Sequence, residues 1–215
     1  SGFCSFEPPK GRKLIELSST DDVKELATTG FYVALRVGFA FPLEEINELP
    51  PPWVDHYTNH RFMLHDPVIR WIYANTGAIA WSAIDLPDPM RVLGQAQTFG
   101  LRYGLAVACF DGNREGQRSF GTFTRADREF DRAEIEALHA YVLRLHHAKA
   151  PPTNLTKAEL EALKMVKEGQ RLKQIAHTLG VTEGAVKQRL KNAKNKLNAS
   201  TSAQAAAMAG EFGLF

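Results

Sequence analysis

The chain has 215 residues, of which 44% are hydrophobic and 23% charged, and its formal net charge is +2 at pH 7. This composition is typical of a globular protein and excludes a disordered or fibrous chain. The length allows one large domain or two modest ones.

Membrane insertion and secretion are not indicated by the sequence. The longest apolar run, residues 31–43, contains Arg36 and is interrupted by Pro42, so it is too short and too polar to span a bilayer. No basic segment followed by an apolar one opens the chain. Two cysteines, Cys4 and Cys109, cannot form a disulfide framework. We therefore expect a cytoplasmic protein with reduced thiols and no membrane partner.

The first two thirds of the chain alternate between strand and helix patterns. We expect strands over residues 31–41, 104–110 and 117–124, and helices over 53–62, 67–74, 89–99 and 132–147. Asp131 and Glu134 have the spacing of a capping box at the start of the last helix. This order predicts an α/β domain, an α-β-α sandwich, over residues 1–147.

A connector follows at residues 148–154, where Pro151 and Pro152 stop the preceding helix. Charge divides at the same place. From Thr153 onward there are ten Lys and Arg against five Asp and Glu, a net charge of +5, whereas residues 1–152 carry −3. A basic C-terminal part on a mildly acidic body favours an anionic partner for residues 155–215 alone, although a chance distribution of surface charge is the simpler alternative.

Residues 155–215 read as four short helices, a small all-α domain. Gly180 and Thr182 form a turn and an N-cap between the second and third helices. On the third helix the inward positions are Val186, Leu190, Ala193 and Leu197, and the outward positions are Lys187, Arg189, Lys191, Lys194 and Lys196. Two helices joined by a tight turn, the second with a basic face, form the helix-turn-helix pattern that binds double-stranded DNA. The alternative is a solvated charged face on an ordinary bundle.

The run LTKAELEALKMVKEGQRLKQIAHTLGVTEGAVKQRLKNAKNKL resembles the DNA-binding module of the LuxR family of bacterial transcription regulators. The resemblance implies a homodimer on inverted-repeat DNA. It also implies that Lys187 and Lys191 reach base edges, while Lys173, Thr182, Gln188 and Arg189 lie nearer the backbone. Lys194 belongs to the same basic face. Arg189, where many members have His, and Gly184 depart from the family pattern.

The spacing Trp53-x3-Tyr57-x8-Asp66-Pro67-x13-Trp81, followed by Phe99 to Gly104, resembles the acyl-homoserine-lactone-binding domain of quorum-sensing LuxR-type regulators. Such a lactone has a polar head and an apolar tail, which suits an apolar pocket with few polar groups. The resemblance implies that Trp53 donates to the lactone carbonyl and that Asp66 accepts from the amide N–H.

Four further positions complete the implied ligand site. Tyr57 donates to the acyl carbonyl or lines the cavity, and Trp81 packs against the ring. Thr124 contacts the start of the acyl chain, and Gly104 allows close backbone approach. Each also has a plainer interpretation, because buried Trp and Tyr are usually core and Asp followed by Pro is a common helix start.

Several alternatives remain open. Leu49 and Ala108 replace residues usual in the family, so a solo regulator that answers another small molecule, or none, is the runner-up. A second alternative is a lactone hydrolase, but this would need a nucleophile or a metal dyad, and neither is found in the sequence. A third is an interaction protein that binds partner proteins through its helices and does not bind DNA. His56 and His60, one helical turn apart, could suggest a metal site together with His65 and Asp66. No Glu follows His56 and no Cys lies nearby, so no metal or cofactor is expected. We expect His146 and His147, beside the connector, to be solvated.

Overall fold

The protein is described by a computed structural model over residues 15–37, 41–111 and 117–215. Cys4 lies outside these residues. The described chain forms two compact units. One contains residues 15–34, 45–109 and 119–145, and the other contains 35–37, 41–44, 110–111, 117–118 and 146–215.

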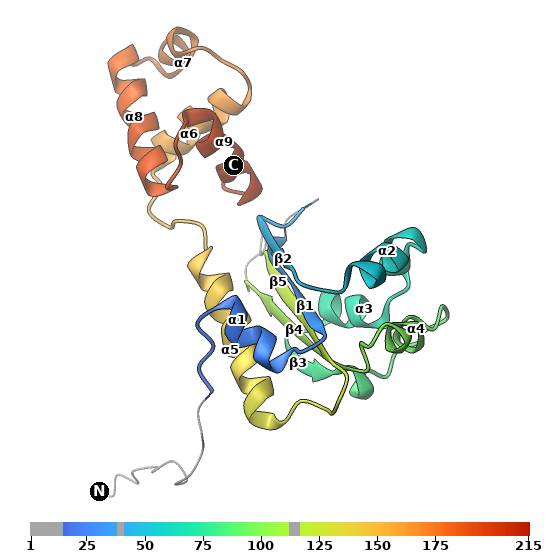
Figure 1. Cartoon of the computed structure of the whole chain (residues 1–215). Helices are drawn as coiled ribbons and strands as arrows, with labels where there is room; N and C mark the ends of the chain where they lie inside the picture. Colours follow the sequence, from blue (N-terminus) through green and yellow to red (C-terminus); the bar gives the residue numbers. More distant parts are fainter. Residues whose placement is uncertain (1–14, 38–40, 112–116) are drawn as a thin grey trace, which may run out of the picture. The chain divides into compact units, whose positions relative to one another are not determined.

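A five-stranded antiparallel sheet forms the centre of the first part of the chain. Its strands are β1 (Gly30–Val37), β2 (Glu44–Asn47), β3 (Gly77–Ala80), β4 (Tyr103–Phe110) and β5 (Arg118–Arg125), in the order β2-β1-β5-β4-β3. Figure 1 shows α1 (Thr20–Leu26) and α5 (Arg132–Ala148) on one face of the sheet. On the other face lie α2 (Pro51–Asn59), α3 (Pro67–Ala74) and α4 (Val92–Thr98). The predicted α-β-α sandwich is confirmed.

The strand predicted over residues 31–41 is shorter in the structure. β1 ends at Val37, residues 38–40 lie outside the described residues, and Phe41 follows as an exposed residue beyond the strand. β2 and β3 were not predicted from the sequence, because each has four residues and neither alternates between buried and exposed positions. Their places are fixed by pairing with longer neighbours, as when Ala80 of β3 pairs with Leu105 of β4.

The capping box predicted at the start of α5 is confirmed. The Glu134 amide donates to Asp131 Oδ1 at 3.0 Å, and Glu134 Oε2 accepts from the Asp131 amide at 2.8 Å. Glu134 is buried and also accepts from Arg125 and Arg128, at 3.1 and 2.8 Å. These contacts, together with the amide of Asp131, hold the pKa of Glu134 below its usual value despite the burial of this carboxyl. The start of α5 is thereby joined to the end of β5.

The prediction that His146 is solvated was wrong. His146, near the end of α5, is 2% exposed, and its Nε2 lies 3.1 Å from Asp111 Oδ1. Its main-chain oxygen accepts from Nε of the buried Arg36 at 2.9 Å, and Arg36 also pairs with Asp111. A guanidinium on the last turn of α5 is favourable, because the carbonyl ends of a helix carry partial negative charge. Burial and the Arg36 charge lower the pKa of His146.

Four helices lie in the C-terminal part of the second unit, and we call this helical part the C-terminal unit. They are α6 (Lys157–Lys167), α7 (Leu172–Leu179), α8 (Glu183–Lys196) and α9 (Ser202–Glu211). Their core contains one or more buried apolar residues from each helix, among them Leu163, Ile175, Leu190 and Ala205. The predicted small all-α domain is confirmed. None of the described helices combines the length and apolar character needed to cross a membrane.

Candidate functional site

A cavity of about 280 Å³ lies between the sheet and the helices α2, α3 and α4. Most of its lining is apolar. Half of the lining residues lie on these helices, and strands β1, β2 and β5 supply Tyr32, Asn47, Phe120 and Thr122. Asp66 is the one ionisable carboxylate among the described lining residues, and none of these residues is Lys, Arg or His. A cavity of this kind suits a neutral ligand with a large apolar part.

Asp66 is fixed at the start of α3. Its Oδ1 accepts from the Val68 amide at 2.8 Å, as an N-cap does, and Pro67 occupies the first helical position, where a missing N–H has no consequence. Its Oδ2 accepts from the Tyr57 hydroxyl at 2.8 Å. Burial raises the pKa of Asp66 above its usual value, in spite of these hydrogen bonds. Asp66 is therefore a buried hydrogen-bond acceptor beside the cavity.

Trp53 and Tyr57 are one turn apart on α2, so both rings lie on the cavity side of this helix. Their ring centroids are 5.5 Å apart with an interplanar angle of 64°. Trp53 is 4% exposed and also packs against Phe62 and Phe99. Burial and the neighbouring Asp66 raise the pKa of Tyr57, so its hydroxyl stays protonated and donates to Asp66. Tyr57 was expected to donate to the acyl carbonyl or to line the cavity; it lines the cavity, and its proton is directed at Asp66.

Trp81 follows the edge strand β3 and packs over Gly104. A Cβ atom on Gly104 would lie 2.0 Å from Cδ2 of the indole, so only glycine fits there. Gly104 therefore allows close approach of Trp81, whereas the sequence analysis expected backbone approach to a ligand. Gly104 lines a neighbouring cavity of about 370 Å³, which shares Trp81 and Leu93 with the first. Within the described residues, the buried Nε1 of Trp81 has no hydrogen-bond partner.

Thr124 is absent from the described cavity lining, and its contact with the acyl chain stays a prediction. It is buried, and its hydroxyl donates to the main-chain oxygen of Gly30 at 2.7 Å, so this hydroxyl supports the pairing of β1 with β5. Thr122, two residues earlier on the same strand, lines the cavity. Its Oγ1 is buried and has no partner among the residues that the structure describes. Thr122 was not predicted; residues two apart share a face of a strand, so alternation along 117–124 is the signal that could have indicated it.

Other residues of the sequence analysis fall around this site. Leu49 lines the cavity, and Ala108 pairs with Gly77 in the sheet. His56 and His60 have ring centroids 4.2 Å apart, but His56 is bonded to Gln95 and His60 to the His56 carbonyl. The described chain contains no cluster of three potential metal-ligating His, Cys, Asp or Glu side chains.

In the C-terminal unit, the turn between α7 and α8 has the expected form. α7 ends at Gly180, whose φ of 63° is left-handed, and α8 begins after Thr182, whose Oγ1 accepts from the Ala185 amide at 3.1 Å. Val186, Leu190, Ala193 and Leu197 are buried, as predicted. This turn orients α8 and leaves its other face outside the core.

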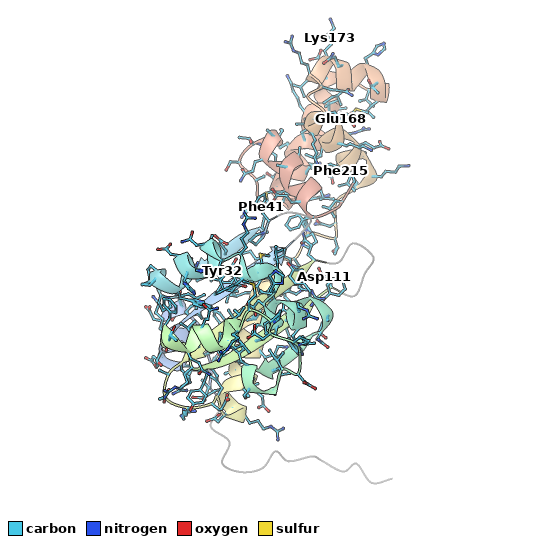
Figure 2. All side chains as sticks on the ribbon, turned by 90° about the vertical axis from the view of Figure 1, so that its right-hand side faces the viewer. Tyr32, Phe41, Asp111, Glu168, Lys173 and Phe215 are labelled. Atoms are coloured by element: carbon cyan, nitrogen blue, oxygen red, sulfur yellow. The ribbon has the colours of Figure 1, made fainter. Side chains whose placement is uncertain are left out.

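The outward face of α8 is basic. Lys187, Gln188 and Lys191 are exposed, and Arg189 and Lys194 are partly exposed. Gln188 donates to Asn192, and Lys194 donates to the Ser200 carbonyl at 3.2 Å. Lys173 is exposed on α7, and Figure 2 shows it at one end of the C-terminal unit. Exposed lysines one turn apart on a projecting helix suit the major groove of DNA.

Lys196 was predicted on the same outward face, but it has a structural role. Its Nζ donates to Glu159 Oε2 at 2.8 Å and to the Asn154 carbonyl at 2.8 Å. Glu159 is buried and closes the capping box at the start of α6 with Thr156. This pair links the end of α8 to the start of α6.

A small-molecule cavity in an α/β domain and a helix-turn-helix domain on the same chain define a ligand-responsive transcriptional regulator. Residues 41–148 match the family described as autoinducer binding domain, and residues 153–209 match bacterial regulatory proteins of the luxR family. The chain belongs to the LuxR family of regulators that carry an autoinducer-binding domain.

Two curated relatives have similar sequences over most of their length. The transcriptional activator protein AnoR of Acinetobacter nosocomialis is 27% identical over 185 residues, which cover 79% of this chain and 77% of AnoR. SolR of Ralstonia nicotianae, also a transcriptional activator protein, is 28% identical over 77% of this chain and 75% of its own. The crystal structure of Escherichia coli SdiA has the same fold, with a TM-score of 0.50 and 24% identity over 92% of both chains.

Proposed function

We propose that the cavity binds an N-acyl-homoserine lactone and that the protein, as a homodimer, binds inverted-repeat promoter DNA in the cytoplasm through α8. The observation that supports lactone binding is that the cavity offers hydrogen-bond donors and acceptors to a ligand but has no cationic side chain in its described lining. Asp66 supplies a buried acceptor, and Thr122 Oγ1 is a buried group without a partner in the described structure. Unpartnered buried polar groups are costly, so a ligand that satisfies them gains affinity.

The polar head of such a lactone matches this set. Its amide N–H reaches Asp66, and its two carbonyls need donors. Trp53 supplies one donor, to the lactone carbonyl. Since the Tyr57 hydroxyl is directed at Asp66, the Thr122 hydroxyl is the donor that we assign to the acyl carbonyl. Trp81 packs against the lactone ring.

The ligand proposal is tested by thermal unfolding of the full chain with a series of N-acyl-homoserine lactones of increasing acyl length. A ligand that fills the cavity binds the folded state alone and raises the melting temperature by mass action. We expect a dose-dependent rise for one range of lengths and none with the matching fatty acid, whose carboxylate would meet Asp66. If the protein is folded without ligand and no lactone raises its melting temperature, the proposal is refuted. The protein would then be a regulator that responds to another small molecule or to none.

The DNA proposal rests on the basic face of α8, on which Lys187 and Lys191 are exposed. Two copies related by a two-fold axis would place their α8 helices in half-sites about one helical turn apart. Selection of binding sequences from random duplexes should yield an inverted repeat, with affinity that falls steeply as salt rises. Binding without a repeated half-site would refute the dimeric arrangement, and affinity independent of salt would refute DNA recognition by this face.

The protein acts in this proposal by binding rather than by catalysis, and it needs no cofactor. Incubation with a lactone should leave the ring intact. Stoichiometric recovery of the unhydrolysed ligand after prolonged incubation would support this; enzyme-dependent ring opening would contradict it.

A further inference from the structure

The strand order gives the ligand cavity a direction. Trp81 follows β3 and Thr122 lies on β5, and among the described cavity-lining residues these two hold the buried polar atoms without partners. Tyr32 on β1 and Asn47 on β2 line the same cavity nearer the β2 edge of the sheet, since the order is β2-β1-β5-β4-β3. A ligand whose head lies beside Trp81 and Thr122 therefore extends its chain across β5 and β1 toward the β2 edge.

Exposure changes along the same direction. At the head end Trp53 and Asp66 are 4% and 7% exposed. At the β2 edge Asn47 is exposed. The residues around the head are thus buried, whereas Asn47 reaches solvent.

The end of the cavity beside β1 and β2 carries polar groups in a fixed arrangement. The Tyr32 hydroxyl donates to Glu45 Oε2 at 2.9 Å, across the pair β1 and β2, and Figure 2 labels Tyr32 on the sheet. Burial and Glu45 raise the pKa of Tyr32, so the phenol keeps its proton and its oxygen can still accept one hydrogen bond.

Asn47 adds donors at this end. Its Oδ1 accepts from the Leu49 amide at 3.2 Å, which leaves the Nδ2 group directed elsewhere with two N–H donors. Within the described residues Nδ2 has no hydrogen bond. Tyr32 and Asn47 together therefore offer donors and an acceptor to one small polar group.

Between the two polar ends the lining is apolar. The Phe120 ring on β5 lies 6.1 Å from the Tyr32 ring, with Leu49 and Val54 also in the lining. This stretch suits methylene groups, whereas Tyr32 and Asn47 suit a hydroxyl.

We propose that Tyr32 and Asn47 form a second polar subsite, which recognises a hydroxyl group at or next to the far end of the acyl chain. The ligand class is then N-acyl-homoserine lactones with a hydroxylated chain end. This inference rests on the proposed function, because it takes the lactone head to lie beside Asp66. The subsite selects among such lactones by the chain end rather than by the head.

The test compares matched pairs of lactones, one with a plain alkyl chain and one with a terminal hydroxyl, at hexanoyl, octanoyl and decanoyl length. Dissociation constants are measured calorimetrically with the full-length protein. In an apolar cavity end the hydroxyl would lower affinity roughly ten-fold or more, because it loses its hydrogen bonds to water. We expect instead that at one length the hydroxylated lactone binds at least as tightly as its alkyl partner.

Two variants assign that result to the subsite. Asn47→Leu and Tyr32→Phe should each weaken the hydroxylated lactone by roughly ten-fold and leave the alkyl lactone within about two-fold. Glu48→Gln is the matched control, since Glu48 follows β2, pairs with Lys24 and is absent from the described cavity lining. It should change neither ligand.

The outcomes separate this inference from the proposed function. If alkyl lactones bind and every hydroxylated partner binds ten-fold more weakly, the subsite is refuted and the lactone site stands. If the hydroxylated lactone binds well but neither variant affects it, the hydroxyl lies in solvent and the subsite is again refuted. If no lactone of either kind binds, the proposed function fails and the subsite fails with it.

Discussion

Replacing Asp66 with Asn separates ligand recognition from stability in this protein. The substitution keeps an oxygen that can accept from the Val68 amide, so the N-cap of α3 is preserved. It removes a buried negative charge whose pKa is raised by burial. A carboxyl with a raised pKa destabilises the folded state as pH rises through that pKa, because the charged form is disfavoured there. At neutral pH the unliganded variant should therefore unfold at a temperature no lower than the wild type.

The loss on the ligand side can be estimated. A hydrogen bond from the ligand amide to a carboxylate contributes about 1.5–3 kcal/mol, which corresponds to roughly a 10- to 150-fold change in Kd. At a lactone concentration of about 100 times the wild-type Kd, binding stabilises the wild type by about 2.7 kcal/mol. For a domain of about 150 residues this raises the melting temperature by roughly 5–11 °C. A variant with a 30-fold weaker Kd would gain only about 0.9 kcal/mol, or roughly 2–4 °C.

The assay is differential scanning calorimetry of wild type and variant, each with and without the best lactone of the series. Asp55→Asn is the matched control, because Asp55 is exposed on α2 and outside the described cavity lining. It should retain the full wild-type shift. A full shift in the Asp66 variant would refute the role of this carboxylate. A large drop in the stability of the unliganded variant would refute the argument from its raised pKa.

Three further predictions concern other parts of the chain. Lys191→Ala should weaken DNA binding roughly ten-fold, measured by anisotropy titration. Lys164→Ala is the control, since Lys164 is exposed on α6, and it should have little effect. Glu159→Ala should cost the C-terminal unit about 1–3 kcal/mol in chemical denaturation, because it removes a cap and leaves Lys196 unpaired; a loss below about 0.5 kcal/mol would contradict this. His146 has a pKa below 6.5 in the folded state, so its neutral form stabilises the fold above pH 6.5 and this contribution is lost as pH falls below that value. His146→Gln should flatten the decline in stability between about pH 6.5 and 5, and an unchanged slope would rule His146 out as its source.

The elements that sequence could predict are those whose signal is local. The helices α5 and α8 carry a full amphipathic stripe, and their caps, Asp131 with Glu134 and Thr182, are set by residues three apart. Trp53 and Tyr57 were placed together because helical spacing fixes which face they share.

What sequence could not place depends on partners distant in the chain. β3 is recognisable only through its pairing with β4, and His146 is buried because Arg36, 110 residues away, reaches its carbonyl. Thr124 was predicted to contact the ligand and Thr122 was not, for the same reason. Both share a face of β5, and only the position of Gly30 shows which hydroxyl is already occupied.

The indole of Trp81 is shared by the ligand cavity and its neighbour, and it lies against a residue without a side chain. At the end where the lactone head is proposed to lie, the cavity is therefore bounded by the side chain of Trp81 rather than by backbone. Exchange of this single residue for a smaller one would join two volumes that already exist, with no rearrangement of the sheet. Descendants of this chain could acquire bulkier effectors by a one-residue step, while the polar contacts on α2 and α3 keep their geometry.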